Sequence, residues 1–155
     1  MAKEIVLTPE GKERLEAELL ELETVKRIEI GARIKVAREF GDISENSEYD
    51  DAKNEQAWIE ARIAEINQVL ANSTMADIPK RSSRVSVGTS VTVIMDDGSE
   101  RRLTIVDAVE ADSSEGRISH ESPVGAALLN TRKGDVVNVN TPNGRTMQLT
   151  VTKIG

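Results

Sequence analysis

The chain of 155 residues contains no cysteine, one histidine and only three aromatic residues. Without cysteine, disulfides, thiolate zinc sites and cysteine nucleophiles are excluded, which agrees with a reducing compartment. Because His120 is the only histidine, a metal site built from several histidines is also excluded, and a Ser-His-Asp triad would need this residue. No apolar run approaches the roughly 20 residues of a membrane span, so we expect a cytoplasmic protein with no membrane contact.

Acidic residues outnumber basic residues only in the first half of the chain. Residues 1–76 hold 17 acids and 10 bases, whereas residues 77–155 hold 10 of each, so the net charge of −7 belongs to the first half. This asymmetry predicts two chemically different domains.

Apolar residues of the first half recur with coiled-coil spacing. Thr8 and Pro9 supply an N-cap and a first helical position. The seam positions expected in the first helix are Leu15, Leu19, Leu22, Val25, Ile28, Ala32 and Val36, and those in the second are Ala52, Gln56, Ile59, Ile63, Ile66 and Leu70. A short turn separates the two runs, which predicts an antiparallel α-helical coiled-coil hairpin over residues 1–76, with its tip near residues 39–51.

The second half has the pattern of a small sheet domain. We expect a linker over residues 77–84, strands over 90–95, 101–108, 136–139 and 146–153, and a short helix over 124–129 that Ser122 and Pro123 begin. The predicted fold class is therefore α+β, with the helical hairpin followed by an antiparallel sheet and one short helix over residues 85–155.

The predicted hairpin turn is strongly acidic. Between residues 39 and 51 the chain carries six carboxylates and no Lys or Arg, namely Glu39, Asp42, Glu45, Glu48, Asp50 and Asp51. In one interpretation Asp42 and Glu45 form a capping box for the second helix and the other acids form a solvated face. In the other, these two residues, at i and i+3, hold one Mg²⁺, an ion that usually takes one or two protein carboxylates and fills its other positions with water and phosphate oxygens.

Two stretches of the chain resemble a known family. The segment from Ala37 to Tyr49, A-R-E-F-G-D-I-S-E-N-S-E-Y, resembles the hairpin tip of the bacterial GreA/GreB transcript cleavage factors, most closely the GreA kind. The segment E-S-P-V-G-A-A-L-L over residues 121–129, with Gly-Asp at 134–135 and T-P-N-G at 141–144, resembles the family's second signature. One difference from the family's sequence pattern is Asn130, which replaces a glycine. Asn is the non-glycine residue that best tolerates a positive φ at such a position.

The resemblance implies a C-terminal domain with an FKBP-like fold and a monomeric transcription elongation factor. Such a factor inserts its coiled coil into the secondary channel of bacterial RNA polymerase and stimulates the polymerase's Mg²⁺-dependent cleavage of backtracked RNA. It is therefore not an enzyme alone, and no cofactor is expected on the isolated chain. Its other partner would be the 3′ end of the nascent RNA.

The resemblance also assigns residues to these roles. Asp42 and Glu45 would take part in cleavage and would hold a Mg²⁺ shared with the polymerase active site. The hairpin residues expected to contact RNA or polymerase are Arg38, Asn46, Glu48 and Tyr49, and the loop expected to bind the channel rim is Glu121, Ser122 and Pro123. Ordinary roles fit several of them, since bases on an acidic coiled coil usually form ion pairs and Ser-Pro commonly begins a helix.

Three other functions fit parts of the pattern. A channel-binding regulator without cleavage activity would share the hairpin, but the G-D-x-x-E-N spacing favours the cleaving kind. A structural coiled-coil adaptor would need no chemistry at the turn. A peptidyl-prolyl isomerase needs an aromatic-lined groove, whereas Phe40, Tyr49 and Trp58, the only aromatic residues, all lie in the predicted hairpin.

Overall fold

The computed structural model describes residues 4–40, 47–78 and 83–155. Contacts between residues divide the chain into two units. The hairpin unit covers Glu10–Ser73, and the C-terminal unit combines Met1–Pro9 with Thr74–Gly155. The expected linker over residues 77–84 stays a prediction, because residues 79–82 lie outside the described part.

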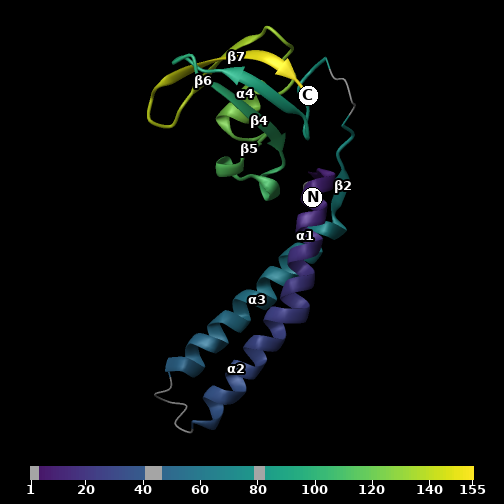
Figure 1. The fold of residues 1–155 in the computed structure, drawn as a ribbon, viewed down its shortest axis with the longest axis vertical. Helices are drawn as coiled ribbons and strands as arrows, with labels where there is room; N and C mark the ends of the chain where they lie inside the picture. Colours follow the sequence, from purple (N-terminus) through teal and green to yellow (C-terminus); the bar gives the residue numbers. More distant parts are fainter. Residues whose placement is uncertain (1–3, 41–46, 79–82) are drawn as a thin grey trace. The chain divides into compact units, whose positions relative to one another are not determined.

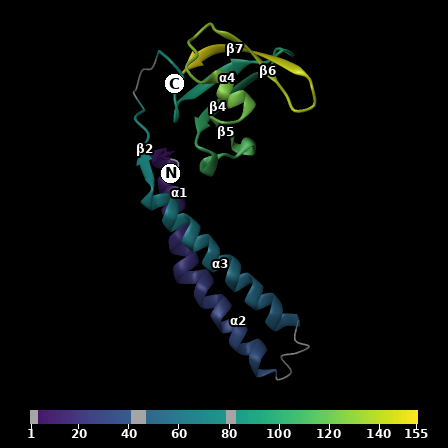
Figure 2. The ribbon, with the colours of Figure 1, turned by 180° about the vertical axis from the view of Figure 1, so that it is seen from behind.

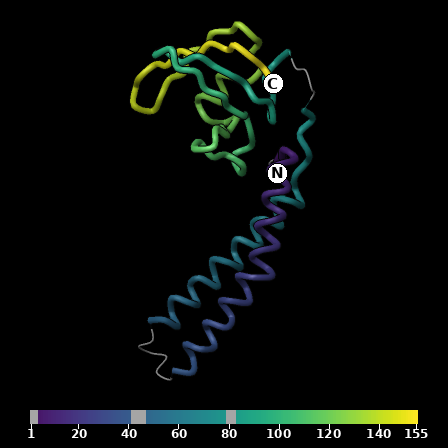
Figure 3. Tube along the Cα trace, viewed as in Figure 1, coloured from purple at the N-terminus to yellow at the C-terminus, as the bar shows by residue number. Residues whose placement is uncertain are grey.

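The hairpin unit consists of two long helical runs. The first joins α1 (Pro9–Glu21), the π-helical segment η1 (Leu22–Lys26) and α2 (Arg27–Glu39). The second is α3 (Ser47–Ala71), which lies beside the first run (Figures 1 and 3). The predicted antiparallel hairpin is thus confirmed.

The seam of the hairpin follows the prediction in α3 but not throughout the first run. Ala52, Ile59, Ile63 and Ile66 of α3 are buried, and so are Leu15 and Leu22 of the first run. Beyond Leu22 the prediction is wrong, because the expected positions Val25, Ile28, Ala32 and Val36 are exposed. The seam there consists of Ile30, Ile34 and Ala37.

The π-helical segment explains this change of register. The backbone N–H of Arg27 donates to the carbonyl of Leu22, five residues back, whereas an α-helix pairs residues four apart. The wider turn holds one extra residue, and one residue corresponds to about 100° of rotation in an α-helix. Every later side chain is therefore rotated away from the position that a regular heptad gives it.

The C-terminal unit is built on a five-stranded sheet with the order β5-β4-β3-β7-β6. Its strands are β3 (Ser90–Ile94), β4 (Glu100–Val106), β5 (Arg117–Ser119), β6 (Val136–Asn140) and β7 (Thr146–Ile154). Helix α4 (Pro123–Leu128) packs beside the sheet (Figure 2). The four predicted strands and the short helix are confirmed, and neighbouring strands are antiparallel except that β5, which was not predicted, pairs in parallel with β4.

The inward side chains of the sheet and Leu128 of α4 form one apolar core. Its buried residues are Val85, Val91, Val93, Leu103, Ile105, Leu128, Val139, Leu149 and Val151. Their alternation with polar residues along β3 and β7 leaves one face of those strands against the core, as expected for a sheet covered on one side. The α+β fold class is confirmed. None of the described helices is both long and apolar enough to cross a membrane.

Short elements complete the C-terminal unit. Strands β1 (Ile5–Leu7) and β2 (Ser73–Met75) pair with each other, and two 3₁₀ turns, η3 (Ala108–Glu110) and η4 (Ser113–Glu115), lie between β4 and β5. Within this unit the buried Glu110 accepts two hydrogen bonds from Thr8, one from the backbone N–H at 2.9 Å and one from the hydroxyl at 2.6 Å. Thr8 immediately precedes α1, which begins at Pro9 as predicted.

Candidate functional site

The acidic turn joins the two long runs of the hairpin. Asp42, Glu45 and Asn46 lie outside the described residues, so their predicted roles stay predictions. The chain itself requires these residues to connect the end of α2 at Glu39 to the start of α3 at Ser47. The available donors are carboxylate oxygens with no histidine or cysteine among them, which is the donor chemistry that Mg²⁺ prefers.

The described residues beside the turn hold α2 and α3 together. Nε of Arg33 lies 2.9 Å from Oε1 of Glu48, and Nη1 of the same side chain lies 2.5 Å from Oε2 of Glu55. Glu48, which was expected to contact RNA or polymerase, is therefore engaged by a base of the facing helix. This interhelical pair places the start of α3 against α2 just before the chain enters the turn.

Other acids and bases near the turn remain exposed. Glu39, Asp50 and Asp51 are exposed, as is Arg38, whereas Tyr49 is half-buried. Among residues 4–40, 47–78 and 83–155, no cluster of three or more Asp, Glu or His side chains is suited to hold a metal ion. A metal ion held by Asp42 and Glu45 stays a prediction, because both residues lie outside the described ranges.

Two further arginines bind carboxylates across the hairpin. Arg62 of α3 donates to both carboxylate oxygens of Glu18 at 2.7 and 2.8 Å, and Arg27 donates to both oxygens of Glu60 at 2.8 and 3.0 Å. The hydrogen bonds from Arg62 lower the pKa of Glu18 below its ordinary value of 4.5, and those from Arg27 lower the pKa of Glu60 in the same way. These pairs link the two runs at separate points along the hairpin.

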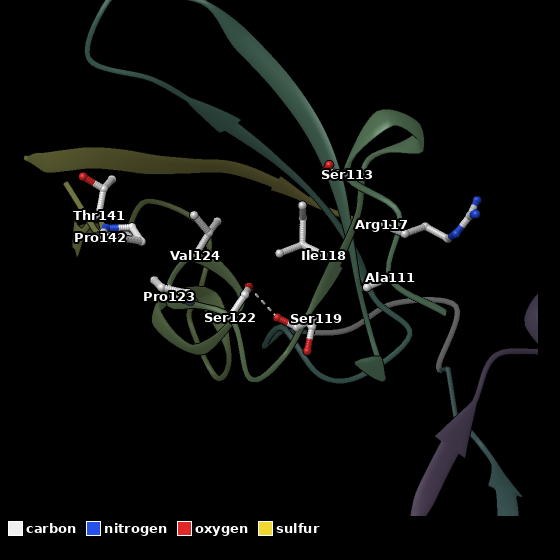
Figure 4. A pocket seen from close by; sticks show the side chains of 11 residues that line it. Ala111, Ser113, Arg117, Ile118, Ser119, Ser122, Pro123, Val124, Thr141 and Pro142 are labelled. Atoms are coloured by element: carbon white, nitrogen blue, oxygen red, sulfur yellow. Dashed lines mark hydrogen bonds between the residues drawn. The ribbon is translucent and has the colours of Figure 1, made fainter. Parts of the chain in front are cut away.

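A groove of about 510 Å³ lies in the C-terminal unit at the start of α4 (Figure 4). We call it the C-terminal groove; its lining residues are Ala111, Ser113, Arg117, Ile118, Ser119, Ser122, Pro123, Val124, Val139, Thr141 and Pro142. Ile118 and Val124 extend toward the same space in Figure 4, whereas Arg117 extends away from it. The lining contains no aromatic residue, unlike the groove that a prolyl isomerase would need.

Two residues of the predicted polymerase-binding loop line this groove. The hydroxyl of Ser122 donates to the carbonyl of Ser119 at 2.7 Å and accepts the N–H of Gly125 at 3.1 Å, which makes Ser122 the N-cap of α4. Pro123 follows at the first helical position and is exposed, as is Glu121. The helix start is confirmed, and contact with polymerase stays a prediction for all three residues.

Gly125 is a residue whose importance the sequence alone did not reveal. A Cβ atom on Gly125 would lie 1.9 Å from the carbonyl oxygen of Ser119, so only glycine lets α4 approach the end of β5 this closely. The signal in the sequence was the glycine itself, two residues after Pro123 inside a predicted helix. The glycine thus sets the shape of the loop that lines the groove.

The expectation for Asn130 is confirmed. Its φ of 67° is the only positive value at a non-glycine residue among the described ranges. In this conformation the N–H of Asn130 donates to the carbonyl of Val85 at 2.7 Å, and the N–H of Val85 donates to the carbonyl of Thr131 at 2.9 Å. The turn after α4 is thereby joined to the first segment of the sheet domain.

Comparison with known proteins identifies the family. Residues 5–75 match the family described as "Transcription elongation factor, N-terminal", and residues 80–155 match "Transcription elongation factor, GreA/GreB, C-term". The chain belongs to the GreA/GreB family. It is therefore a transcription elongation factor, and membership of this family implies an interaction with RNA polymerase.

Individual relatives of the GreA/GreB family cover nearly the whole chain. The transcription elongation factor GreA of Geobacillus kaustophilus is 51% identical over 144 residues, which are 92% of this chain and 91% of that protein. GreA of Chloroflexus aggregans is 50% identical over 154 residues, which are 98% of each chain. The crystal structure of GreA factor homolog 1 (Gfh1) of Thermus thermophilus covers 99% of each chain at 29% identity, with a TM-score of 0.46.

Proposed function

We propose that this chain inserts its hairpin into the secondary channel of RNA polymerase and stimulates the polymerase's own cleavage of backtracked RNA. The observation that carries the proposal is the place of the G-D-I-S-E-N segment. It joins α2 to α3 at one end of a hairpin that arginine–carboxylate pairs hold together. A stiff pair of helices with carboxylates at its turn is suited to carry those groups into a narrow channel.

In this proposal Asp42 and Glu45 act at the polymerase's active centre. They would hold a Mg²⁺ shared with the polymerase, an ion whose chemistry is to stabilise charge on the oxygens that attack and leave during RNA cleavage. The proposed contribution of the chain is to carry these two carboxylates, in the segment between α2 and α3, to that centre. Because the remaining ligands belong to the polymerase, the chain alone has no nuclease activity and binds no cofactor.

The C-terminal groove supplies the second contact in this proposal. Ser122 and Pro123 line it, and five of the other nine lining residues are apolar, which suits an apolar projection at the rim of the channel. This contact provides affinity, whereas the acidic turn provides chemistry. The protein would act as a monomer on one polymerase, and its RNA contact would be the extruded 3′ end.

A cleavage assay tests the proposed function. A purified elongation complex is stalled and backtracked with 3′-labelled RNA, and the chain is added with Mg²⁺. We expect short labelled fragments whose rate of release rises with the concentration of the chain and that do not form when polymerase is omitted. Binding to the polymerase without faster release would contradict the proposal and would favour a channel-binding regulator without cleavage activity.

A further inference from the structure

The outward side of the first helical run, from η1 into α2, carries an unpartnered aliphatic stripe. Val25, Ile28, Ala32 and Val36 follow one another at spacings of three, four and four residues, which places them on one side of a helix. Val25 is 42% exposed, Ile28 67% and Val36 53%, and Ala32 is exposed as well. We call these four residues the outer stripe.

The stability of the hairpin does not account for the outer stripe. The seam against α3 is filled at this level by Ile30, Ile34 and Ala37. Isoleucine and valine also have lower helix propensity than Gln, Lys or Glu, the residues that an exposed helix surface usually carries. Three aliphatic side chains larger than alanine therefore lie in solvent at positions where a polar residue would suit the helix better.

The π-helical segment creates this second apolar side. With a regular α-helix, the spacing of the outer stripe would continue the seam that begins at Leu15 and Leu22. The extra residue of η1 turns the stripe away from α3, and the hydroxyl of Thr24 within η1 donates to the carbonyl of Leu20 at 2.6 Å. Helix α2 consequently has one apolar side for α3 and another that no described residue fills.

Charge argues against a second copy of the chain as the partner of this stripe. Between residues 10 and 73 the sequence has sixteen acids and nine bases, so two hairpins packed together would bring two net charges of −7 side by side. This repulsion favours a different molecule as the partner. RNA polymerase is the partner that family membership implies, and the stripe reaches Val36, one turn before the 82% exposed Phe40 and the acidic turn.

We propose that the outer stripe is the surface with which the hairpin packs against an aliphatic strip of RNA polymerase. This inference rests on the proposed function, because insertion of the hairpin would make the stripe continuous with the contact at the acidic turn. The stripe supplies affinity by burying aliphatic side chains, and it takes no part in the chemistry of cleavage.

Substitution of the two most exposed members of the stripe tests this inference. The variant Ile28→Gln/Val36→Gln keeps side-chain length near that of the originals and raises helix propensity, so we expect its circular dichroism and melting temperature to match those of the wild type. Competition with labelled wild-type chain for polymerase should show a dissociation constant raised at least tenfold. The matched control is Val136→Gln in the C-terminal unit, where Val136 is 52% exposed and Val36 is 53% exposed.

The outcomes separate this inference from the proposed function. If the stripe binds polymerase, saturating amounts of the double variant restore the wild-type rate of fragment release, and the control binds normally. An unchanged dissociation constant for the double variant would overturn the inference. Sedimentation that shows a wild-type dimer lost in the variant, with polymerase binding unchanged, would overturn it as well. Failure of the wild type to release fragments would refute the proposed function, while the competition measurement would still decide the role of the stripe.

Discussion

At the scale of single residues, the C-terminal groove depends on a glycine more than on the loop residues that the family resemblance singles out. Ser122 caps α4 through its hydroxyl and Pro123 begins the helix, but either role is available to several residue types. Gly125 has no substitute, because any side chain would meet the carbonyl of Ser119. Glycine is required at this position because α4 and β5 approach each other closely, and the sequence does not reveal that approach.

The variant Gly125→Ala should therefore destabilise the C-terminal unit. We expect a loss of about 1–3 kcal/mol in the free energy of unfolding, because the added methyl group forces α4 away from β5. Urea unfolding followed by circular dichroism measures the loss. Gly31→Ala is the control, since a methyl group on Gly31 of α2 would meet no neighbouring atom outside its own helix, and this variant should be neutral or stabilising. A fully stable Gly125→Ala variant would show that α4 and β5 do not approach this closely.

The contact between Thr8 and Glu110 shows a second limit of reasoning from sequence at this scale. The two residues are 102 positions apart, and nothing in the local pattern around Glu110 distinguishes it from the exposed acids of the chain. Asp42 and Glu45, by contrast, were singled out by a pattern of neighbours. Local motifs can be recognised in a single sequence, whereas a buried polar contact between distant segments can be recognised only when the fold is known.

At the scale of elements, the π-helical segment decides which side of α2 packs against α3. Helix α3 was predictable because its apolar spacing is regular from Ala52 to Ile66. The seam of the first run was not predictable, because the residues of the outer stripe fit a regular heptad as well as the true seam residues do. The spacing of the apolar residues also does not reveal the extra residue of η1. Strands β1, β2 and β5 were not predicted, because each is only three residues long.

Paired substitutions in α2 test the register directly. Ile34→Ala should lower the free energy of unfolding of the hairpin by about 2–4 kcal/mol, because it removes a buried side chain from the seam. Val36→Ala, two residues further on, should change it by less than about 0.5 kcal/mol, because this side chain is exposed. Circular dichroism, to which the long helices of the hairpin contribute strongly, follows the unfolding of this unit. Similar losses for both variants would place the seam elsewhere.

The interhelical ion pairs predict how hairpin stability depends on pH. In the folded state Arg62 lowers the pKa of Glu18 below 4.5, so the pair contributes stability above the unfolded pKa and loses it as the pH falls through the lower, folded pKa. The variant Arg62→Gln should therefore lower the melting temperature at pH 7, and the difference from wild type should shrink on acidification from about pH 5 to pH 3.

The control for this pH dependence is a looser pair on the same hairpin. Lys12 and Glu16 lie 3.9 Å apart on the exposed side of α1, so Lys12→Gln should have little effect on the melting temperature at any pH. Thermal unfolding by circular dichroism between about pH 3 and pH 7 gives both comparisons. If the melting temperatures of Arg62→Gln and wild type differ by a constant amount over this range, the role assigned to Glu18 is contradicted.

At the scale of the whole molecule, the two halves of the chain differ in net charge. The excess of acids lies in the hairpin, and residues 77–155 have equal numbers of acids and bases. This division, the order of the units and the family were all predictable from sequence, because they depend on composition and on motifs that span nearly the full chain. The two apolar surfaces, the outer stripe and the C-terminal groove, were not, since each depends on how elements pack.

The central claim is that two carboxylates at the hairpin turn act within the polymerase's active centre. The measurement that tests it compares Asp42→Asn/Glu45→Gln with Asp50→Asn/Asp51→Asn, which removes two exposed charges from the adjacent turn of α3. Each variant is added at saturation to a backtracked complex, and both its affinity and the rate of RNA fragment release are recorded. We predict that the first variant binds like wild type but that fragments are then released only at the intrinsic rate of polymerase without the factor. The second variant should retain most of the stimulation. Undiminished release with the first variant would contradict the account.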